Sequence, residues 1–372
     1  MNTRPIMRSI TLPLFLVALV ASAQQAFTCR TNEPSILEAI HHNDPALIQA
    51  IADANAELEE FTSNYAEGER STYTIPIVFH IIHNYGPENI GDDQVLDAVR
   101  ILNEDYNKLN PDWPNVRPEF LSLVANVSIE FKLARKDPNG NCTNGITRTV
   151  STLTNDGTQT MKDLIQWPRN KYLNVWVAAS ADGAAGYTLT PGSVSFNSSA
   201  DGIVVEHTYL GSMGTSQPSH SRTLTHEVGH WINLEHCWGS SNTPAVAANC
   251  NDDDGVSDTP NTIGWTTCNL NGASCSSPLD NVENYMEYSY CSKMFTNGQK
   301  TRMIAALNSN TSQRNQLISA SNLAATGGND LPALCQASFG SSARQICAGT
   351  PVDFTDLSHD GVTSWQWTFT GG

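Results

Sequence analysis

Residues 226–236 read HEVGHWINLEH, the most specific pattern in the chain. Residues four apart share one face of a helix, so His226 and His230 can present two imidazoles to one zinc ion. Glu227, one position further round the helix, can act as general base toward a zinc-bound water. His236 follows six residues after His230, far enough for the chain to turn back with a third imidazole. Three protein ligands leave one coordination position for water, as in catalytic zinc sites.

The same helix has a second face that predicts how it is held. Leu224, Val228 and Trp231 recur at helical spacing on the side away from the first histidine, so this face is expected to be buried while the histidines line a cleft. The alternative interpretation is an ordinary core helix with incidental histidines. A third histidine at a fixed offset from the first two disfavours that alternative.

The segments before this helix predict a mixed sheet. Strands are expected at residues 74–83, 127–133, 172–177 and 202–207, where apolar residues run or alternate. A helix is expected from Asp92 onward, and helical spacing also appears between Ile36 and Ile51. Residues 239–298 lack such periodicity and are rich in small polar residues and cysteine. The predicted fold class is α/β (α+β): a lobe of mixed twisted sheet with an active-site helix, followed by a loop-rich lobe.

The N-terminus has the features of a secretion signal. Arg4 and Arg8 precede an apolar run at residues 10–20, and residues 21–23 are Ala-Ser-Ala, a cleavage pattern. The run is too short to cross a bilayer, which disfavours a membrane anchor. We therefore expect a secreted protein, extracellular or at the cell surface, in which disulfides can form.

The overall charge argues against one class of partner. The 372-residue chain has 20 basic and 37 acidic side chains and a net charge of −17. An acidic chain without a basic run is a poor match for nucleic acid or anionic lipid. The acid excess is compatible with binding of hard cations.

Acidic residues and cysteines gather in the loop-rich segment. Residues 252–259 read DDDGVSDT, and oxygen ligands of this kind suit calcium, so Asp253, Asp254 and Asp258 are candidate calcium ligands. The alternative is a solvated acidic loop. Four cysteines of the segment allow three pairings: Cys250, Cys268, Cys275 and Cys291. A second, cysteine-ligated zinc would need closely spaced pairs, which these cysteines lack.

Together these motifs resemble one family of peptidases. Residues 284–288 read NYMEY, similar to the Met-turn of metzincins, and residues 294–299 read MFTNGQ. Combined with the zinc-binding stretch, they resemble the pappalysin family and its ulilysin-like bacterial branch, over about Ile75 to Leu317. The resemblance implies a metzincin-type catalytic domain with these roles: zinc ligands His226, His230 and His236, general base Glu227, hydrophobic floor Met286, and Tyr288 as a stabiliser of the tetrahedral intermediate.

The resemblance also implies several finer features. It favours disulfides Cys250–Cys275 and Cys268–Cys291, and a calcium ion in the loop-rich lobe. Most metzincins have glycine where this chain has Asn233, because the backbone leaves the helix there in a left-handed conformation. Asparagine is the next most tolerant residue for positive φ, so the turn is expected to persist.

Cys29 is a candidate latency switch. A thiolate is a good zinc ligand, and latent metzincins use an N-terminal cysteine to occupy the position of the catalytic water. The ulilysin-like branch usually reads Cys-Gly-Thr where this chain reads Cys29-Arg30-Thr31. The resemblance thus implies that Cys29 binds zinc in a latent form and that residues 24–70 are a propeptide. The alternative is a cysteine that is unpaired or structurally paired.

The C-terminal stretch is expected to differ from the rest. Residues 352–356 and 364–369 alternate as strands and resemble the start of a PKD-type β-sandwich, which needs more residues than are present here. Two further disulfides are conceivable, Cys142–Cys237 and Cys335–Cys347. The expected division is a signal peptide 1–23, a propeptide 24–70, a catalytic domain 71–325 and an incomplete sandwich 331–372.

The expected function is a secreted zinc-dependent endopeptidase, made as a latent precursor, with zinc and calcium as cofactors and protein or peptide substrates. The alternatives are an inactive zinc-binding adhesion protein, which an intact Glu227 and Tyr288 disfavour, and a zinc hydrolase of a non-peptide amide, which the Met-turn disfavours. Ulilysin-like enzymes prefer a basic residue after the scissile bond, because an acid near the Met-turn lines that pocket. Residues 288–293, YSYCSK, contain no acid, so a weakened preference is expected.

Overall fold

The structure is a computed structural model that describes residues 28–66, 68, 72–329, 337, 339–342, 349–356, 358 and 364–368. Its α-helices are α1 Pro34–His41, α2 Pro45–Ser63, α3 Asp92–Tyr106, α4 Pro118–Leu121, α5 Gln159–Lys162, α6 Thr223–Trp231, α7 Asn297–Asn308, α8 Arg314–Leu317 and α9 Ala320–Thr326. Its strands are β1 Tyr73–His83, β2 Ile129–Leu133, β3 Ile146–Val150, β4 Leu173–Ala178, β5 Gly186–Tyr187, β6 Ile203–Glu206, β7 Phe339–Ser341 and β8 Phe354–Asp356. The expected signal peptide, 1–23, lies outside the described residues.

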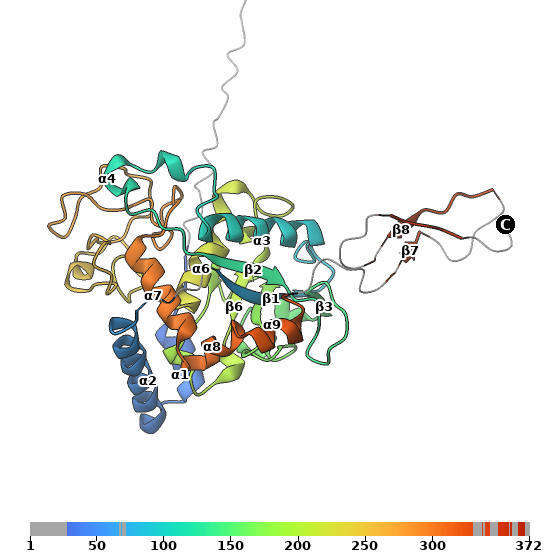
Figure 1. The fold of residues 1–372 in the computed structure, drawn as a ribbon, viewed down its shortest axis with the longest axis horizontal. Helices are drawn as coiled ribbons and strands as arrows, with labels where there is room; N and C mark the ends of the chain where they lie inside the picture. Colours follow the sequence, from blue (N-terminus) through green and yellow to red (C-terminus); the bar gives the residue numbers. More distant parts are fainter. Residues whose placement is uncertain are drawn as a thin grey trace, which may run out of the picture.

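A mixed sheet of six strands forms the centre of the molecule (Figure 1). The strands follow the order β2-β1-β4-β6-β5, and β3 continues the pairing along β1. All pairs are parallel except β5 with β6, which is antiparallel. β1 is buried along almost its whole length because it lies inside the sheet, and a run of branched apolar residues suits that place. The mixed α/β lobe expected from the sequence is confirmed, and β3 and β5 are additions to it.

Helices α3 and α6 pack against each other and against the sheet, which fixes the zinc-motif helix in the core. Every residue of α6 is buried, including the apolar face of Leu224, Val228 and Trp231. α3 begins at Asp92, as expected, although Gly91 occupies the N-cap position in place of Asp92. Because α6 is buried on all sides, packing holds its histidines in fixed positions.

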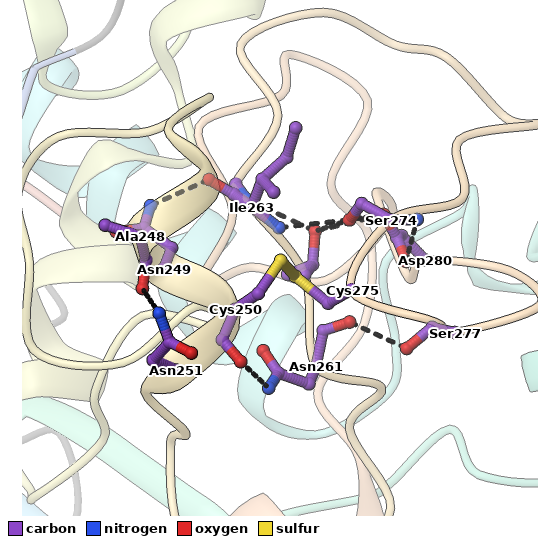
Figure 2. Close-up of a disulfide and its surroundings, with 12 residues drawn as sticks. Ala248, Asn249, Cys250, Asn251, Asn261, Ile263, Ser274, Cys275, Ser277 and Asp280 are labelled. Atoms are coloured by element: carbon purple, nitrogen blue, oxygen red, sulfur yellow. Dashed lines mark hydrogen bonds between the residues drawn. A yellow bond between two sulfur atoms is a disulfide. The ribbon is translucent and has the colours of Figure 1, made fainter.

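The segment between α6 and α7 has no α-helix or strand and is cross-linked instead. Two disulfides, Cys250–Cys275 and Cys268–Cys291, confirm the pairing that the family resemblance implies. Figure 2 shows the first of them within a network of loop hydrogen bonds, in which Asn261 donates to the carbonyl of Cys250. The two disulfides interlace along the chain. They therefore cross-link the loops that precede the Met-turn to the segment that follows it, in a lobe with little regular structure.

Two expectations from the sequence are wrong: one concerns the disulfide Cys142–Cys237 and the other a strand near the C-terminus. Cys142 is disulfide-bonded whereas Cys237 is a free, buried thiol, so the pair Cys142–Cys237 does not form. Cys237 is buried in the hydrophobic core that contains the zinc-motif helix, whereas Cys142 is exposed. Near the C-terminus β7 pairs with β8, while residues 364–368 are not a strand, although Trp367 packs on Phe339 and Phe354. Cys335 and Cys347 lie outside the described residues.

The N-terminal segment folds onto the catalytic lobe. α1 and α2 confirm the helical spacing of residues 36–51, and α2 packs against α7 and against residues 192–194. Leu58 of α2 is 1% exposed, which shows that this helix shares a hydrophobic core with the rest of the molecule. No described helix is long and apolar enough to cross a membrane.

Candidate metal centre

The three histidines of the zinc motif converge on one point. The Nε2 atom of His230 lies 3.1 Å from that of His226 and 3.2 Å from that of His236. Each ring turns its other nitrogen toward a backbone carbonyl: Nδ1 of His226 toward Tyr285 at 2.7 Å, that of His230 toward Leu234 at 2.7 Å and that of His236 toward Ser241 at 3.0 Å. A proton on each Nδ1 leaves three Nε2 lone pairs that face one another, an arrangement that fits a bound cation.

Burial keeps these histidines neutral. It lowers the pKa of His230 to about 4 and the pKa values of His226 and His236 well below the usual range. Neutral imidazole is the form of histidine that binds zinc. The donor set therefore has both the protonation state and the convergence that a zinc site needs.

The backbone turns sharply between the second and third histidines. Asn233 has a φ of 78°, the left-handed conformation expected for this position, and the amide of Leu234 donates to the carbonyl of Gly229. This bond closes the helix in the way that glycine-type caps do. The turn brings His236 back to the face that carries His226 and His230.

Glu227 lies beside the histidines and is fully buried. Burial raises its pKa to about 8, and its Oε1 atom has no hydrogen-bond partner. Gly186 of β5 makes room for it, because a Cβ there would lie 3.1 Å from the Glu227 Cγ. A carboxyl group with one free oxygen and a pKa near neutrality is suited to accept and release a proton.

Cys29 occupies the fourth position of the cluster. Its Sγ and the three histidine nitrogens lie within 4.8 Å of one another, the only such group of His, Cys, Asp or Glu among the described residues. The Sγ atom is 3.5 Å from Glu227 Oε2, and the Cys29 amide donates to the hydroxyl of Tyr288 at 3.2 Å. The backbone at Cys29 also pairs with Gly186 of β5. The N-terminal segment thus lies directly on the histidine cluster.

The Met-turn packs against the zinc-motif helix and against the third histidine. Met286 is fully buried, and a Cβ on Gly229 of α6 would lie 2.5 Å from its sulfur. Tyr288 packs edge-on against His236, with ring centroids 5.0 Å apart, while Trp238 stacks flat on this histidine at 4.3 Å and also contacts the Tyr288 ring at 4.9 Å. The two motifs that the sequence singles out are therefore in direct contact.

A buried polar network behind the site has no counterpart in the sequence analysis. Asp105 of α3 accepts hydrogen bonds from Tyr285 at 2.9 Å and Thr225 at 2.7 Å, and it faces the Arg222 guanidinium. Burial raises the pKa of Asp105 to about 7, although Arg222 opposes this shift. The one signal in the sequence for this network is Asp105 itself, an acidic residue beside the apolar stripe of α3.

The acidic loop does not gather its carboxylates. Asp254 is buried and accepts from Thr259, whereas Asp258 accepts from the Gly298 amide at the start of α7. Asp253 accepts from the amide of Gly255, two residues on in its own loop. Among the described residues, the carboxylate oxygens of these three aspartates do not gather in one cluster. Calcium binding there stays a prediction.

A cavity of about 440 Å³ opens beside the histidine cluster. His226 and Tyr288 line it together with other residues that include Arg222, Glu287 and Lys293. None of the described residues between 28 and 66 lines this cavity. A substrate side chain entering it would lie close to the metal position.

Comparison with known proteins places this arrangement in a family. Residues 155–308 match the model of the peptidase M43 family, described as pregnancy-associated plasma protein-A. An extracellular metalloprotease of Uncinocarpus reesii is 30% identical over 264 residues, which cover 67% of this chain and 82% of the relative. The chain belongs to this pappalysin family. It is a zinc metalloendopeptidase.

Solved structures of family members agree with the fold. A promirolysin mutant from Tannerella forsythia is 32% identical with a TM-score of 0.66, and the match covers 78% of this chain and 97% of that one. Mature mirolysin in complex with a cleaved peptide is 34% identical with a TM-score of 0.62, over 69% and 99% of the two chains. These likenesses confirm the metzincin fold in this pappalysin.

Proposed function

We propose that this pappalysin is secreted as a latent precursor and, once its N-terminal segment is removed, hydrolyses peptide bonds of protein or peptide substrates. The observation that carries the proposal is the convergence of three Nε2 atoms beside a buried glutamate with one free oxygen. The likeness to mature mirolysin, whose solved structure is a complex with a cleaved peptide, supports a peptide substrate.

The site residues divide into a metal-binding set and a reacting set. His226, His230 and His236 would hold zinc, which when bound supplies a water of lowered pKa and polarises the scissile carbonyl. Glu227 then accepts a proton from the attacking water through its free Oε1 and delivers it to the leaving amine. The hydroxyl of Tyr288, which the Cys29 amide contacts in this form, would donate to the oxyanion.

The contacts of Cys29 support latency. With its sulfur beside the three histidine nitrogens, Cys29 would occupy the zinc coordination position that the attacking water needs. Arg30 replaces the usual glycine of the branch, and its side chain forms an ion pair with Asp182, so the departure adds an anchor to the N-terminal segment. Burial and the nearby Glu227 raise the pKa of the Cys29 thiol well above its ordinary value, and a bound cation is what would favour the thiolate.

Secretion and calcium binding belong to the same proposal. Relatives from several fungi carry the name extracellular metalloprotease, and the two disulfides fit an oxidising compartment. The buried carboxyl group of Asp254 supports a cation in the acidic loop. Calcium that raises the melting temperature of the wild type, but not that of an Asp254→Asn variant, would support this site.

A Cys29→Ala precursor tests latency directly. Because the thiol can no longer occupy the fourth position, the variant precursor is expected to cleave casein before its N-terminal segment is removed. The measurement compares casein cleavage by freshly purified precursors, with and without a chelator. If the variant is as inactive and as long-lived as the wild-type precursor, Cys29 is not the switch.

A further inference from the structure

Arg302 of α7 joins three parts of the molecule that are far apart in sequence. Its Nε donates to the carbonyl oxygen of Asn233 at 2.6 Å, and its two terminal nitrogens grip the carboxylate of Glu59 in α2, Nη1 at 2.7 Å. The Arg302 side chain is 9% exposed and Glu59 is 48% exposed, so the guanidinium is shielded from water while the carboxylate of Glu59 is reached from solvent. One guanidinium thus ties the zinc-motif turn to the N-terminal segment.

The carbonyl that Arg302 holds belongs to the turn that brings back the third histidine. Asn233 has a positive φ and lies just past the end of α6, where carbonyl groups lack helical partners. The Nε–H of Arg302 satisfies this carbonyl with a charge-assisted bond. Since His236 follows three residues later, the direction of its approach depends on this turn.

We propose that Arg302 is a positioning residue for His236, and that Glu59 uses the same guanidinium as a second anchor of the latent form, separate from Cys29. The second part rests on the proposed latency. In the precursor, Glu59 occupies the Nη edge of Arg302 while Nε holds Asn233. When the N-terminal segment leaves, the Nη edge is released and the Nε bond remains.

The acidic loop explains how Arg302 keeps its place in the mature enzyme. A Cβ on Gly255 would lie 3.3 Å from Nη1, so this loop packs closely on the guanidinium. The charge of Arg302 also opposes the raised pKa of the neighbouring Asp254.

The anchor is tested in the full precursor by replacing Glu59 with glutamine, which keeps the shape and removes the charge. Glu60→Gln, at the exposed next position of α2, is the matched control. Both changes are made in a Glu227→Ala background so that self-cleavage does not interfere. The readout is the rate at which Cys29 is alkylated, followed by mass spectrometry so that Cys29 is distinguished from the free thiol of Cys237.

Loss of a charged two-point contact is expected to speed alkylation of Cys29 roughly tenfold in Glu59→Gln. Glu60→Gln should match the parent protein. Equal rates in all three proteins would overturn the anchor. The Cys29→Ala precursor separates the two claims: if it is active while Glu59→Gln alkylates at the parent rate, only the anchor fails. If the Cys29→Ala precursor is inactive, the latency on which the anchor rests fails with it.

The positioning role is tested in the mature enzyme, which no longer contains Glu59. Arg302→Gln is expected to lose zinc to a chelator roughly tenfold faster than the wild type, because the charged donor to Asn233 is weakened. Arg302→Lys keeps a charged donor and should recover most of the slow release. Zinc release at the wild-type rate in both variants, or equally fast release in both, would overturn the role of this hydrogen bond.

Discussion

At the scale of single residues, two buried carboxyl groups at and beside the metal centre have strongly raised pKa values. Burial raises the pKa of Asp105 to about 7 and that of Glu227 to about 8. A carboxyl group with a higher pKa in the folded than in the unfolded chain binds more protons when folded. Its contribution to stability therefore falls as the pH rises from the unfolded pKa through the folded one.

Asp105→Asn tests this at one position. Asparagine keeps the shape and cannot ionise, so the wild type is expected to lose stability relative to the variant between about pH 4 and pH 7. At 1.36 kcal/mol per pKa unit the loss is at most about 4 kcal/mol. Denaturant unfolding of both proteins from pH 4 to pH 8 measures it, and the difference between them cancels the other titrations. A difference that does not vary with pH would contradict the raised pKa of Asp105.

Helical spacing alone reveals only residues within one element, whereas His236, Tyr288 and Cys29 followed from the motif offset and the family resemblance. His226, Glu227 and His230 follow from helical spacing, because one turn of helix fixes their relative places. Asp105, Gly186 and Arg302 come from α3, β5 and α7, and no local pattern relates them to the zinc motif. Their roles depend on tertiary contacts, so they became visible only in the structure.

At the scale of elements, α6 and the Met-turn are in such close contact that one methyl group added to Gly229 would clash with Met286. A Cβ on Gly229 would lie 2.5 Å from the sulfur of the buried Met286. Gly229 lacks a positive φ, so backbone strain does not enter the comparison. The contact between the two elements can therefore be tested by volume alone.

Gly229→Ala is expected to lower the unfolding free energy by about 1–3 kcal/mol, the usual cost of overpacking a core. The control is Gly68→Ala, outside the helices, where a new Cβ meets nothing within 4 Å. Thermal or denaturant unfolding of the two variants measures the difference. Equal stability of Gly229→Ala and wild type would show that Met286 moves aside freely.

The prediction of strands succeeded where burial is continuous. β1 carries a long apolar run and lies inside the sheet, so its pattern is unambiguous. β3 is a half-exposed strand with polar residues, and β5 has two residues, too few to show a period. β5 nevertheless contacts Glu227 and pairs with Cys29, which shows that a short edge strand can shape the site more than a long central one.

At the scale of the whole molecule, the cavity beside the cluster joins both lobes. Its cations are already paired: Arg222 with Asp112 at 3.0 Å and Lys293 with Glu283 at 2.8 Å. Glu287, which also lines it, is buried and accepts the Trp265 amide, and burial raises its pKa well above the ordinary value. Glu287 Oε1 has no hydrogen-bond partner, but a buried carboxyl group with a raised pKa is a poor counter-ion for an entering basic side chain.

Profiling of the mature enzyme on a peptide library is therefore expected to show little preference for Arg or Lys after the scissile bond. Apolar and uncharged residues should be cleaved at comparable rates. Glu287→Gln should leave the ratio of basic to uncharged residues unchanged. Near-exclusive cleavage before Arg that disappears in Glu287→Gln would show that Glu287 ionises and recruits the basic side chain.

The central claim is that the converging histidines hold zinc while Glu227 moves the proton. The most direct test compares mature wild type with Glu227→Ala for bound zinc, by elemental analysis, and for the rate of casein cleavage. We predict equal zinc in both and a loss of activity of at least roughly 10²–10⁴-fold in the variant, the range of general-base contributions. Zinc bound equally with activity within about tenfold of wild type would contradict the role of Glu227.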